Sequence, residues 1–164
     1  MKVSKSASYA LHALMYMVRH ATDLPVTTET IARSEGIPAS YLAKLCRSLV
    51  KAGFIRSVTG SKKGYEFAKP PEEISLLELF EAVEGHSLFD DCLLRNCECG
   101  GTPGNCHIYA VWVNSTRKIK KLLAETSVET SAWNHPEHRF DVLPEVSVEE
   151  MRTVKRRSQS ARRV

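Results

Sequence analysis

Four cysteines stand close together near the middle of the chain, and their side chains could act as thiolate ligands for a metal. They are Cys92, Cys97, Cys99 and Cys106. The stretch that holds them is rich in glycine, so apolar packing cannot organise it and the thiols are free to converge on one centre. Iron and zinc both accept thiolate ligands. The spacing therefore indicates a metal site without distinguishing between metals.

Other interpretations of the same thiols stay open at this point. They include a structural zinc site, a thiol–disulfide sensor that uses Cys97 and Cys99, and unligated thiols in a regulator without a cluster. A small redox enzyme or electron carrier could use the same segment. The fifth cysteine, Cys46, lies on the apolar face of a predicted helix, so we expect it in the core.

The number of cysteines and the shortness of the apolar stretch near the N-terminus predict a cytoplasmic location. Five cysteines suit ligands, redox thiols or core residues in a reducing compartment better than a disulfide framework. The longest apolar stretch near the N-terminus, residues 13–18, is too short to span a bilayer and lacks a small-residue cleavage site. We therefore expect no membrane partner.

Charge is unevenly distributed along the 164 residues. Residues 1–70 carry 11 Lys or Arg against 4 Asp or Glu, residues 71–100 carry 1 against 8, and residues 151–164 carry 6 against none. Basic ends favour a polyanionic partner. The composition is that of a soluble globular chain, and no Ser-His-Asp set, phosphate-binding loop or pair of acid–base carboxylates supports catalysis, so we expect no enzyme.

Two short helices in the first half of the chain predict a helix-turn-helix. After a first helix over 8–20, Thr27 can cap a helix over 28–35, and Gly36 can end it in a left-handed conformation. Another helix starts at Pro38, with an apolar stripe that includes Leu42 and Leu45. Small and apolar residues at these spacings are typical of DNA-reading helix pairs.

A β-hairpin follows the helix pair. Alternating residues 54–58 and 65–68 predict two strands, and a basic turn with two glycines joins them. A basic hairpin after a helix-turn-helix is a wing. Lys and Arg side chains there would meet phosphates, and short polar groups at the helix start could reach base edges. The residues that we expect to bind double-stranded DNA are Thr28, Ser40, Tyr41, Lys44, Arg47, Lys51, Lys62 and Lys63.

Two further helices are predicted after the wing. Ser75 and Glu78 form a capping box, and Gly85 ends the helix that it starts. From Ile108 a long helix carries an apolar stripe that it cannot bury alone. Packing against its twin in a homodimer would bury that stripe and set two recognition helices about one DNA turn apart, which predicts a pseudo-palindromic operator.

The expected architecture is mainly α with a small β-hairpin wing: a winged helix-turn-helix plus a long C-terminal dimerisation helix. We divide the chain into a DNA-binding domain (1–85), a cysteine-rich loop (86–107), a dimerisation helix (108–126) and an irregular segment with a basic, disordered tail (127–164). The tail would add nonspecific phosphate contacts.

The stretch 32–67 and the residues after it resemble the family of winged-helix repressors that includes IscR, NsrR and CymR. The features that carry the resemblance are Ile37, Ser40-Tyr41-Leu42, Lys51-Ala52-Gly53, Ser57-Val58, Gly60, Gly64-Tyr65 and the segment 70–74. The similarity runs from Ser6 to about Glu125. It implies a homodimeric bacterial transcription regulator, with the helix from Pro38 in the major groove and the wing in the minor groove.

The wing departs from the family pattern at two positions. Family wings commonly carry Arg before the first glycine and Gly-Gly before the tyrosine, whereas this chain has Thr59 and Lys63-Gly64. Minor-groove reading by an arginine at position 59 is therefore lost. Lys62 or Lys63 would supply the charge instead, and we expect a different operator preference.

The same resemblance implies an iron–sulfur cluster, [2Fe-2S] or [4Fe-4S], in the cysteine loop. Members that sense iron–sulfur status, nitric oxide or redox state hold it with three cysteines, which match Cys92, Cys99 and Cys106 here, with six residues in each gap. The candidates for a fourth ligand or a substitute are Cys97, His107, and His12 from the opposite subunit; a relative of the IscR type has a histidine where this chain has Tyr109.

We therefore expect a homodimeric DNA-binding transcription regulator whose operator binding is controlled by this cluster. The alternative is a cluster-free winged-helix regulator of the same family, controlled by a protein partner, a small ligand, zinc or thiol oxidation.

Overall fold

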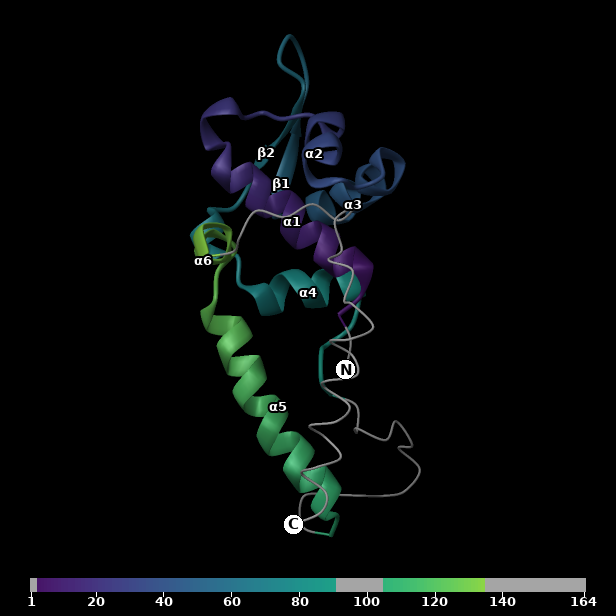
Figure 1. Cartoon of the computed structure of the whole chain (residues 1–164), viewed down its shortest axis with the longest axis vertical. Coiled ribbons are helices and arrows are strands. Elements are labelled where there is room, and N and C mark those ends of the chain that lie inside the picture. The colour runs from purple at the N-terminus through teal and green to yellow at the C-terminus, as the bar shows by residue number, and fades with distance from the viewer. Residues whose placement is uncertain (1–2, 91–104, 135–164) are drawn as a thin grey trace, which may run out of the picture.

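The computed structural model describes residues 3–90 and 105–134. Its helices and strands follow the order α1, η1, α2, α3, β1, β2, η2, α4, α5, α6 (Figure 1). Their bounds are α1 Lys5–Arg19, η1 Ala21–Asp23, α2 Thr28–Glu35, α3 Ala39–Lys51, β1 Ile55–Val58, β2 Gly64–Phe67, η2 Pro71–Glu73, α4 Leu76–Glu84, α5 His107–Glu125 and α6 Val128–Asn134. The expected mainly α architecture with a hairpin wing is confirmed.

Helix α1 is the central element of the core. It contacts α2, α3, α4 and α6, so most of its residues from Ala7 to Val18 are buried, and not only the single stripe that its sequence predicts. Leu14, Met15 and Met17 are at most 1% exposed. An amphipathic stripe shows one buried face, but α1 is covered on several sides by elements distant in sequence.

The helix-turn-helix forms as its sequence predicts. Thr27 caps α2 by accepting a hydrogen bond from the backbone N–H of Thr30 at 3.2 Å, and Gly36 ends the helix with a φ of 68°. The apolar stripe of α3 is buried in the core, where it comprises Leu42, Leu45, Cys46 and Leu49. This leaves the rest of α3 facing solvent.

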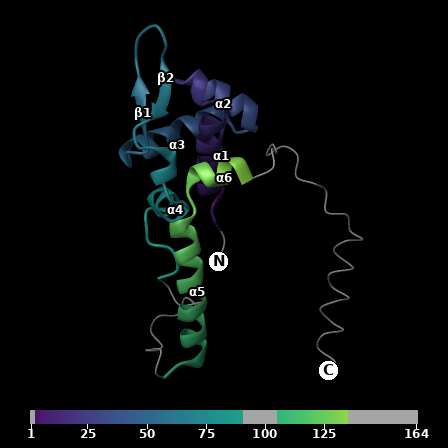
Figure 2. The ribbon, with the colours of Figure 1, turned by 90° about the vertical axis from the view of Figure 1, so that its left-hand side faces the viewer.

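The wing is the antiparallel pair β1 and β2, with Ile55 opposite Phe67 and Val58 opposite Gly64. It projects beside α2 from the head, the part of the molecule formed by α1–α4, α6 and the base of the wing (Figures 1 and 2). The segment before α2 joins it through a single bridge: Val26 and Tyr65 exchange two backbone hydrogen bonds of 3.0 and 2.9 Å. The base of the wing is therefore fixed to the chain that leads into the helix-turn-helix.

Helix α5 runs away from the head and is attached to it at its C-terminal end (Figure 1). There the backbone N–H of Leu76 donates to the Thr126 carbonyl, and that of Val128 donates to the Ile74 carbonyl, both at 2.9 Å. The chain then forms α6, whose Val128 and Ala132 are buried against the core.

The prediction of an irregular segment after residue 126 is wrong for residues 128–134, which form α6. The backbone carbonyl of Ala132 accepts a 3.0 Å hydrogen bond from Arg19 of α1. This helix is stabilised by its contact with α1, because seven residues are too few for a helix to be stable alone. No helix within the two described stretches combines the length and the apolar composition that crossing a membrane requires.

Candidate nucleic-acid interface and cysteine segment

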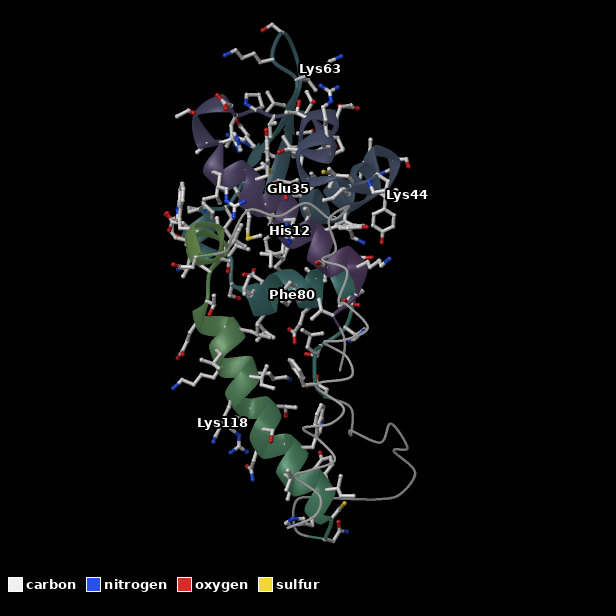
Figure 3. All side chains as sticks on the ribbon, in the orientation of Figure 1. His12, Glu35, Lys44, Lys63, Phe80 and Lys118 are labelled. Atoms are coloured by element: carbon white, nitrogen blue, oxygen red, sulfur yellow. The ribbon has the colours of Figure 1, made fainter. Side chains whose placement is uncertain are left out.

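The predicted DNA-binding side chains of α3 and the wing lie on the surface. Ser40, Lys44, Arg47 and Lys51 are exposed on α3, because its four apolar residues turn the opposite face into the core. Lys62 and Lys63 are exposed in the turn between the wing strands. Figure 3 shows Lys44 and Lys63 in the head, with Lys118 of α5 far from both. The structure thus brings basic groups from two elements to one end of the molecule.

Thr28 lies at the junction of α2 and the wing. Together with Lys63 and Tyr65 it lines an open hollow of about 430 Å³, which Glu29 also borders. Thr28 is the first residue of α2, so backbone N–H groups of the first turn lack partners within the helix. A DNA phosphate would be attracted by that helix end and by Lys63, and repelled by the Glu29 carboxylate.

Tyr41 differs from the other predicted contacts because its hydroxyl group already has a partner. It is hydrogen-bonded to Ser6 Oγ of α1, and either oxygen can donate. Its ring meets that of Tyr9 edge to face, with the centroids 5.7 Å apart. Tyr41 is nevertheless 38% exposed. The structure therefore places Tyr41 at the surface but fastened to α1.

Of the predicted metal ligands, Cys106 and His107 mark the start of α5. Cys106 is the N-cap: its Sγ accepts a hydrogen bond from the backbone N–H of Tyr109 at 3.5 Å, and the thiol is free and half-buried. His107 is the first residue of the helix and is exposed. Cys92, Cys97 and Cys99 lie outside the described residues. Within residues 3–90 and 105–134, no three His, Cys, Asp or Glu side chains gather around a point that could hold a metal ion.

His12 lies inside the head rather than on a free surface. Its Nδ1 is 3.1 Å from Oε2 of Glu35, and the two side chains are only 7% and 9% exposed (Figure 3). This contact joins α1 to the last residue of α2. A metal could bind only the other ring nitrogen, Nε2, because Nδ1 is paired with Glu35, and the buried side chain would have to become accessible to the partner subunit.

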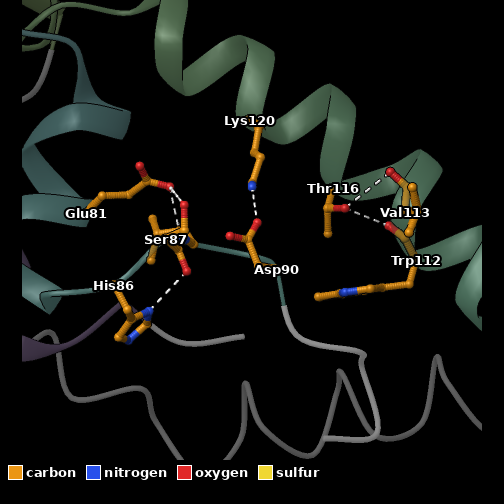
Figure 4. A network of polar contacts seen from close by, with 9 residues as sticks. Glu81, His86, Ser87, Asp90, Trp112, Val113, Thr116 and Lys120 are labelled. Atoms are coloured by element: carbon orange, nitrogen blue, oxygen red, sulfur yellow. Dashed lines mark hydrogen bonds and ion pairs between the residues drawn. The ribbon is translucent and has the colours of Figure 1, made fainter. Parts of the chain in front are cut away.

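The turn that follows α4 is held from both sides (Figure 4). Oε1 of Glu81 accepts hydrogen bonds from Leu88 N at 2.8 Å and from Ser87 Oγ at 3.2 Å. On the other side Lys120 of α5 pairs with Asp90, and the hydrogen bond that it donates lowers the pKa of the Asp90 carboxyl below its ordinary value. Between these contacts Phe89 has a φ of 67°, which is unfavourable for a side chain of its size. The segment leading into the cysteine loop therefore leaves the head along a defined path.

A comparison with known proteins identifies the family. The family model described as "Rrf2: Iron-dependent Transcriptional regulator" matches residues 3–132. The chain belongs to the Rrf2 family. It is 31% identical to the HTH-type transcriptional regulator IscR of Aliivibrio salmonicida, over 75% of this chain and 72% of that protein. Like its Rrf2 relatives, it is a DNA-binding transcription regulator and not an enzyme.

Solved structures show the Rrf2 fold in the same arrangement. CymR, described as the global cysteine regulator of B. subtilis, superposes with a TM-score of 0.70 at 21% identity, covering 83% of this chain and 99% of CymR. IscR of T. potens superposes with a TM-score of 0.64 at 25% identity, covering 83% and 89% of the two chains. The resemblance to the family of IscR and CymR is therefore confirmed.

Several contacts of this Rrf2 chain had no signal in the sequence. Ser6 and Tyr41 are 35 residues apart, His12 and Glu35 are 23 apart, and Asp90 and Lys120 are 30 apart. Helical periodicity reports neighbours three or four residues apart and carries no information on such pairs. Sequence reasoning therefore found the exposed basic groups but missed the polar contacts that orient the helices carrying them.

Proposed function

We propose that the protein is a homodimeric transcription regulator whose operator binding is controlled by an iron–sulfur cluster in the cysteine segment before α5. The observation that carries the cluster is the place of Cys106. Its thiol caps the N-terminus of a long helix, where the positive end of the helix dipole favours a negatively charged ligand. The family description "Iron-dependent" supports the same assignment.

Cys106 would be one ligand of the cluster, and Cys92 and Cys99, which lie outside the described residues, would be the other two, as the family resemblance implies. When bound, a cluster supplies a redox-sensitive or labile group whose state changes how its ligands are held together. His107 is exposed next to Cys106, whereas His12 is buried against Glu35 in its own subunit. For a fourth ligand, His107 therefore needs less rearrangement than the partner's His12, and Cys97 stays a further candidate.

Exposed apolar side chains on α5 support the homodimer. Ile108, Val111 and Leu122 are 47%, 52% and 64% exposed in the single chain. These residues are separated by multiples of about 3.6, so they follow one side of the helix. Burying them against a second α5 would place two copies of α3 on one DNA duplex, which favours a pseudo-palindromic operator.

The head supplies the contacts with DNA. Exposed Lys44, Arg47 and Lys51 would contact phosphates from α3, Lys62 and Lys63 would do so from the wing, and Ser40 would reach base edges. Without an arginine at position 59, the basic residues in the turn of the wing are lysines, which act as point charges. We therefore expect the wing to add affinity with little sequence discrimination.

The experiment that tests the cluster is purification without oxygen, followed by the visible absorption spectrum and the quantification of iron and sulfide. The same samples, loaded and metal-free, are then titrated against a DNA duplex selected from a random pool. We expect stoichiometric iron and sulfide and at least a tenfold difference in operator affinity between the two forms, which corresponds to about 1.4 kcal/mol of coupling.

Cys106→Ala should lose the cluster and the difference in affinity, while Cys46→Ala, which removes a buried thiol, should keep both. A colourless protein that resists cluster reconstitution and still binds the operator would overturn the cluster and leave a cluster-free regulator. A Cys106→Ala variant with the wild-type spectrum would remove this residue from the ligand set.

A further inference from the structure

The start of α1 is attached to the start of the recognition helix α3. The hydroxyl of Tyr41 is hydrogen-bonded to Ser6 Oγ, and the Tyr41 ring packs edge to face against Tyr9 with an interplanar angle of 81°. One side chain of α3 is thus held at its hydroxyl and at its ring. A tyrosine that is 38% exposed would otherwise be free to change rotamer.

This attachment lies on the exposed side of the first turn of α3, whose opposite side is buried through Leu42. Pro38 precedes the helix and no side chain caps its first turn. The residues expected to reach base edges and phosphates, Ser40 and Lys44, lie in the same first turns as Tyr41. Because helical residues three apart share a face, an anchor at Tyr41 restricts where Lys44 can point.

The same turn of α1 is also attached to α4. The backbone N–H of Ser4 donates to Oε1 of Glu84 at 3.1 Å, and Ser4 Oγ accepts from Ala7 N at 3.2 Å as the cap of α1. Glu84 is the last residue of α4, just before the turn that leads toward the cysteine segment. Residues 4–9 therefore connect the end of α4 with the beginning of α3.

We propose that Tyr41 is a positioning residue for operator recognition: its hydroxyl, bonded to Ser6, fixes the first turn of α3 against α1 and α4. In this role the hydroxyl does not contact DNA. Losing it leaves the phosphate contacts of the lysines intact but lets the first turn of α3 move. The specific complex must then order this turn on binding, and nonspecific binding need not.

A double-mutant cycle tests the proposal, using metal-free full-length protein with Tyr41→Phe, Ser6→Ala and both changes together. Binding is measured by fluorescence anisotropy to a selected operator duplex and to a random-sequence duplex, at several salt concentrations. One hydrogen bond predicts a loss of roughly 3- to 10-fold in operator affinity for each single variant. The double variant should be no weaker than the singles, because both changes break the same bond.

We expect affinity for random DNA and its salt dependence to stay as in the wild type. Hydrogen exchange of the backbone amides in residues 41–44 should become faster in both single variants. Ser48→Ala is the matched control, since it removes an exposed hydroxyl from the same helix at a position that takes no part in the contact with Ser6 and Tyr9. It should change neither affinity nor exchange.

Four results would overturn the assignment. Equal losses on operator and random DNA would make the Tyr41 hydroxyl a general DNA contact. Additive effects of the two substitutions would show that Tyr41 and Ser6 do not act through one bond. Lower operator affinity with unchanged amide exchange would exclude a positioning role, and wild-type affinity in Tyr41→Phe would exclude any role. Since metal-free protein is used, failure of the cluster proposal would leave this test unaffected.

Discussion

At the scale of single residues, close contacts decide which positions tolerate change. The sequence predicts a glycine turn in the wing but not why Gly64 must be glycine. A Cβ atom added there would lie 2.6 Å from the carbonyl oxygen of Val26, at the bridge that fixes the wing to the segment before α2. Two backbones approach each other at this point, so no side chain can rotate away to make room.

Gly64→Ala should therefore destabilise the folded protein by about 2 kcal/mol, because the bridge between Val26 and Tyr65 must open to admit the methyl group. Chemical denaturation measures this. Gly60→Ala is the control: Gly60 also has a positive φ, but no atom lies within 4 Å of its added Cβ. Equal losses in the two variants would show that backbone conformation, and not the contact with Val26, sets the cost.

Burial also changes the chemistry of Cys46, as its place on the apolar stripe predicts. Desolvation raises the pKa of the Cys46 thiol to about 11, from 9.0. The folded state therefore holds its proton more tightly than the unfolded state. Its contribution to stability is fully present below pH 9 and is lost as the pH rises through about 11.

Between pH 9 and 11, the free energy of unfolding should thus fall more steeply for the wild type than for Cys46→Ala. Denaturation curves at several pH values give the slope of the free energy of unfolding against pH for each protein. The difference between the two slopes removes the contribution of the other titrating groups. In the folded protein at pH 8, Cys46 should also resist alkylation, as peptide mass spectrometry would show. Parallel pH curves, or rapid alkylation, would contradict the assignment of a buried protonated thiol.

At the scale of elements, local signals predicted the helices well. The cap at Thr27 and the glycine at 36 bound α2 at the predicted residues, and Ser75 caps α4 by accepting from Glu78 N as its capping box predicts. The turn after α4 could not be predicted, since its path depends on Lys120 of α5. Helix α6 was missed because only Val128 and Ala132 become buried in its seven residues, too few to show a period.

Glu81→Ala should loosen the turn after α4, because it removes the acceptor of the Leu88 backbone N–H. Hydrogen exchange at Leu88 should increase about tenfold, as expected for one lost hydrogen bond. Glu81→Gln keeps an acceptor oxygen and should have a smaller effect. Glu78→Ala serves as the control: Glu78 lies on α4 like Glu81, and the substitution breaks only its exposed ion pair with Lys69. An unchanged exchange rate in Glu81→Ala would show that the turn is held by other contacts.

At the scale of the whole molecule, α5 presents exposed apolar side chains along one side, at Ile108, Val111 and Leu122. Val111 is 52% exposed, so replacing it by Asp should leave the single chain folded but prevent a second copy from packing there. Sedimentation should show a monomer, and operator affinity should fall about 100-fold with the loss of bivalent binding. Arg117→Asp alters a side chain more than a quarter turn away and should stay dimeric. A dimeric Val111→Asp protein would place the interface elsewhere.

Helix α5 is joined to the head through its C-terminal half, at Lys120 and at residues 126–128, and projects from it like a lever. Its C-terminal end is fixed to the head by the hydrogen bonds around Thr126 and Val128, and Cys106 stands at the other end. Nineteen residues at 1.5 Å each give an arm of about 28 Å. A rotation of roughly 5° at the fixed end would move Cys106 by about 2.5 Å. Conversely, a displacement of Cys106 would reach the head reduced in distance and increased in force, and the proposed cluster would act on the DNA-reading helices in this way.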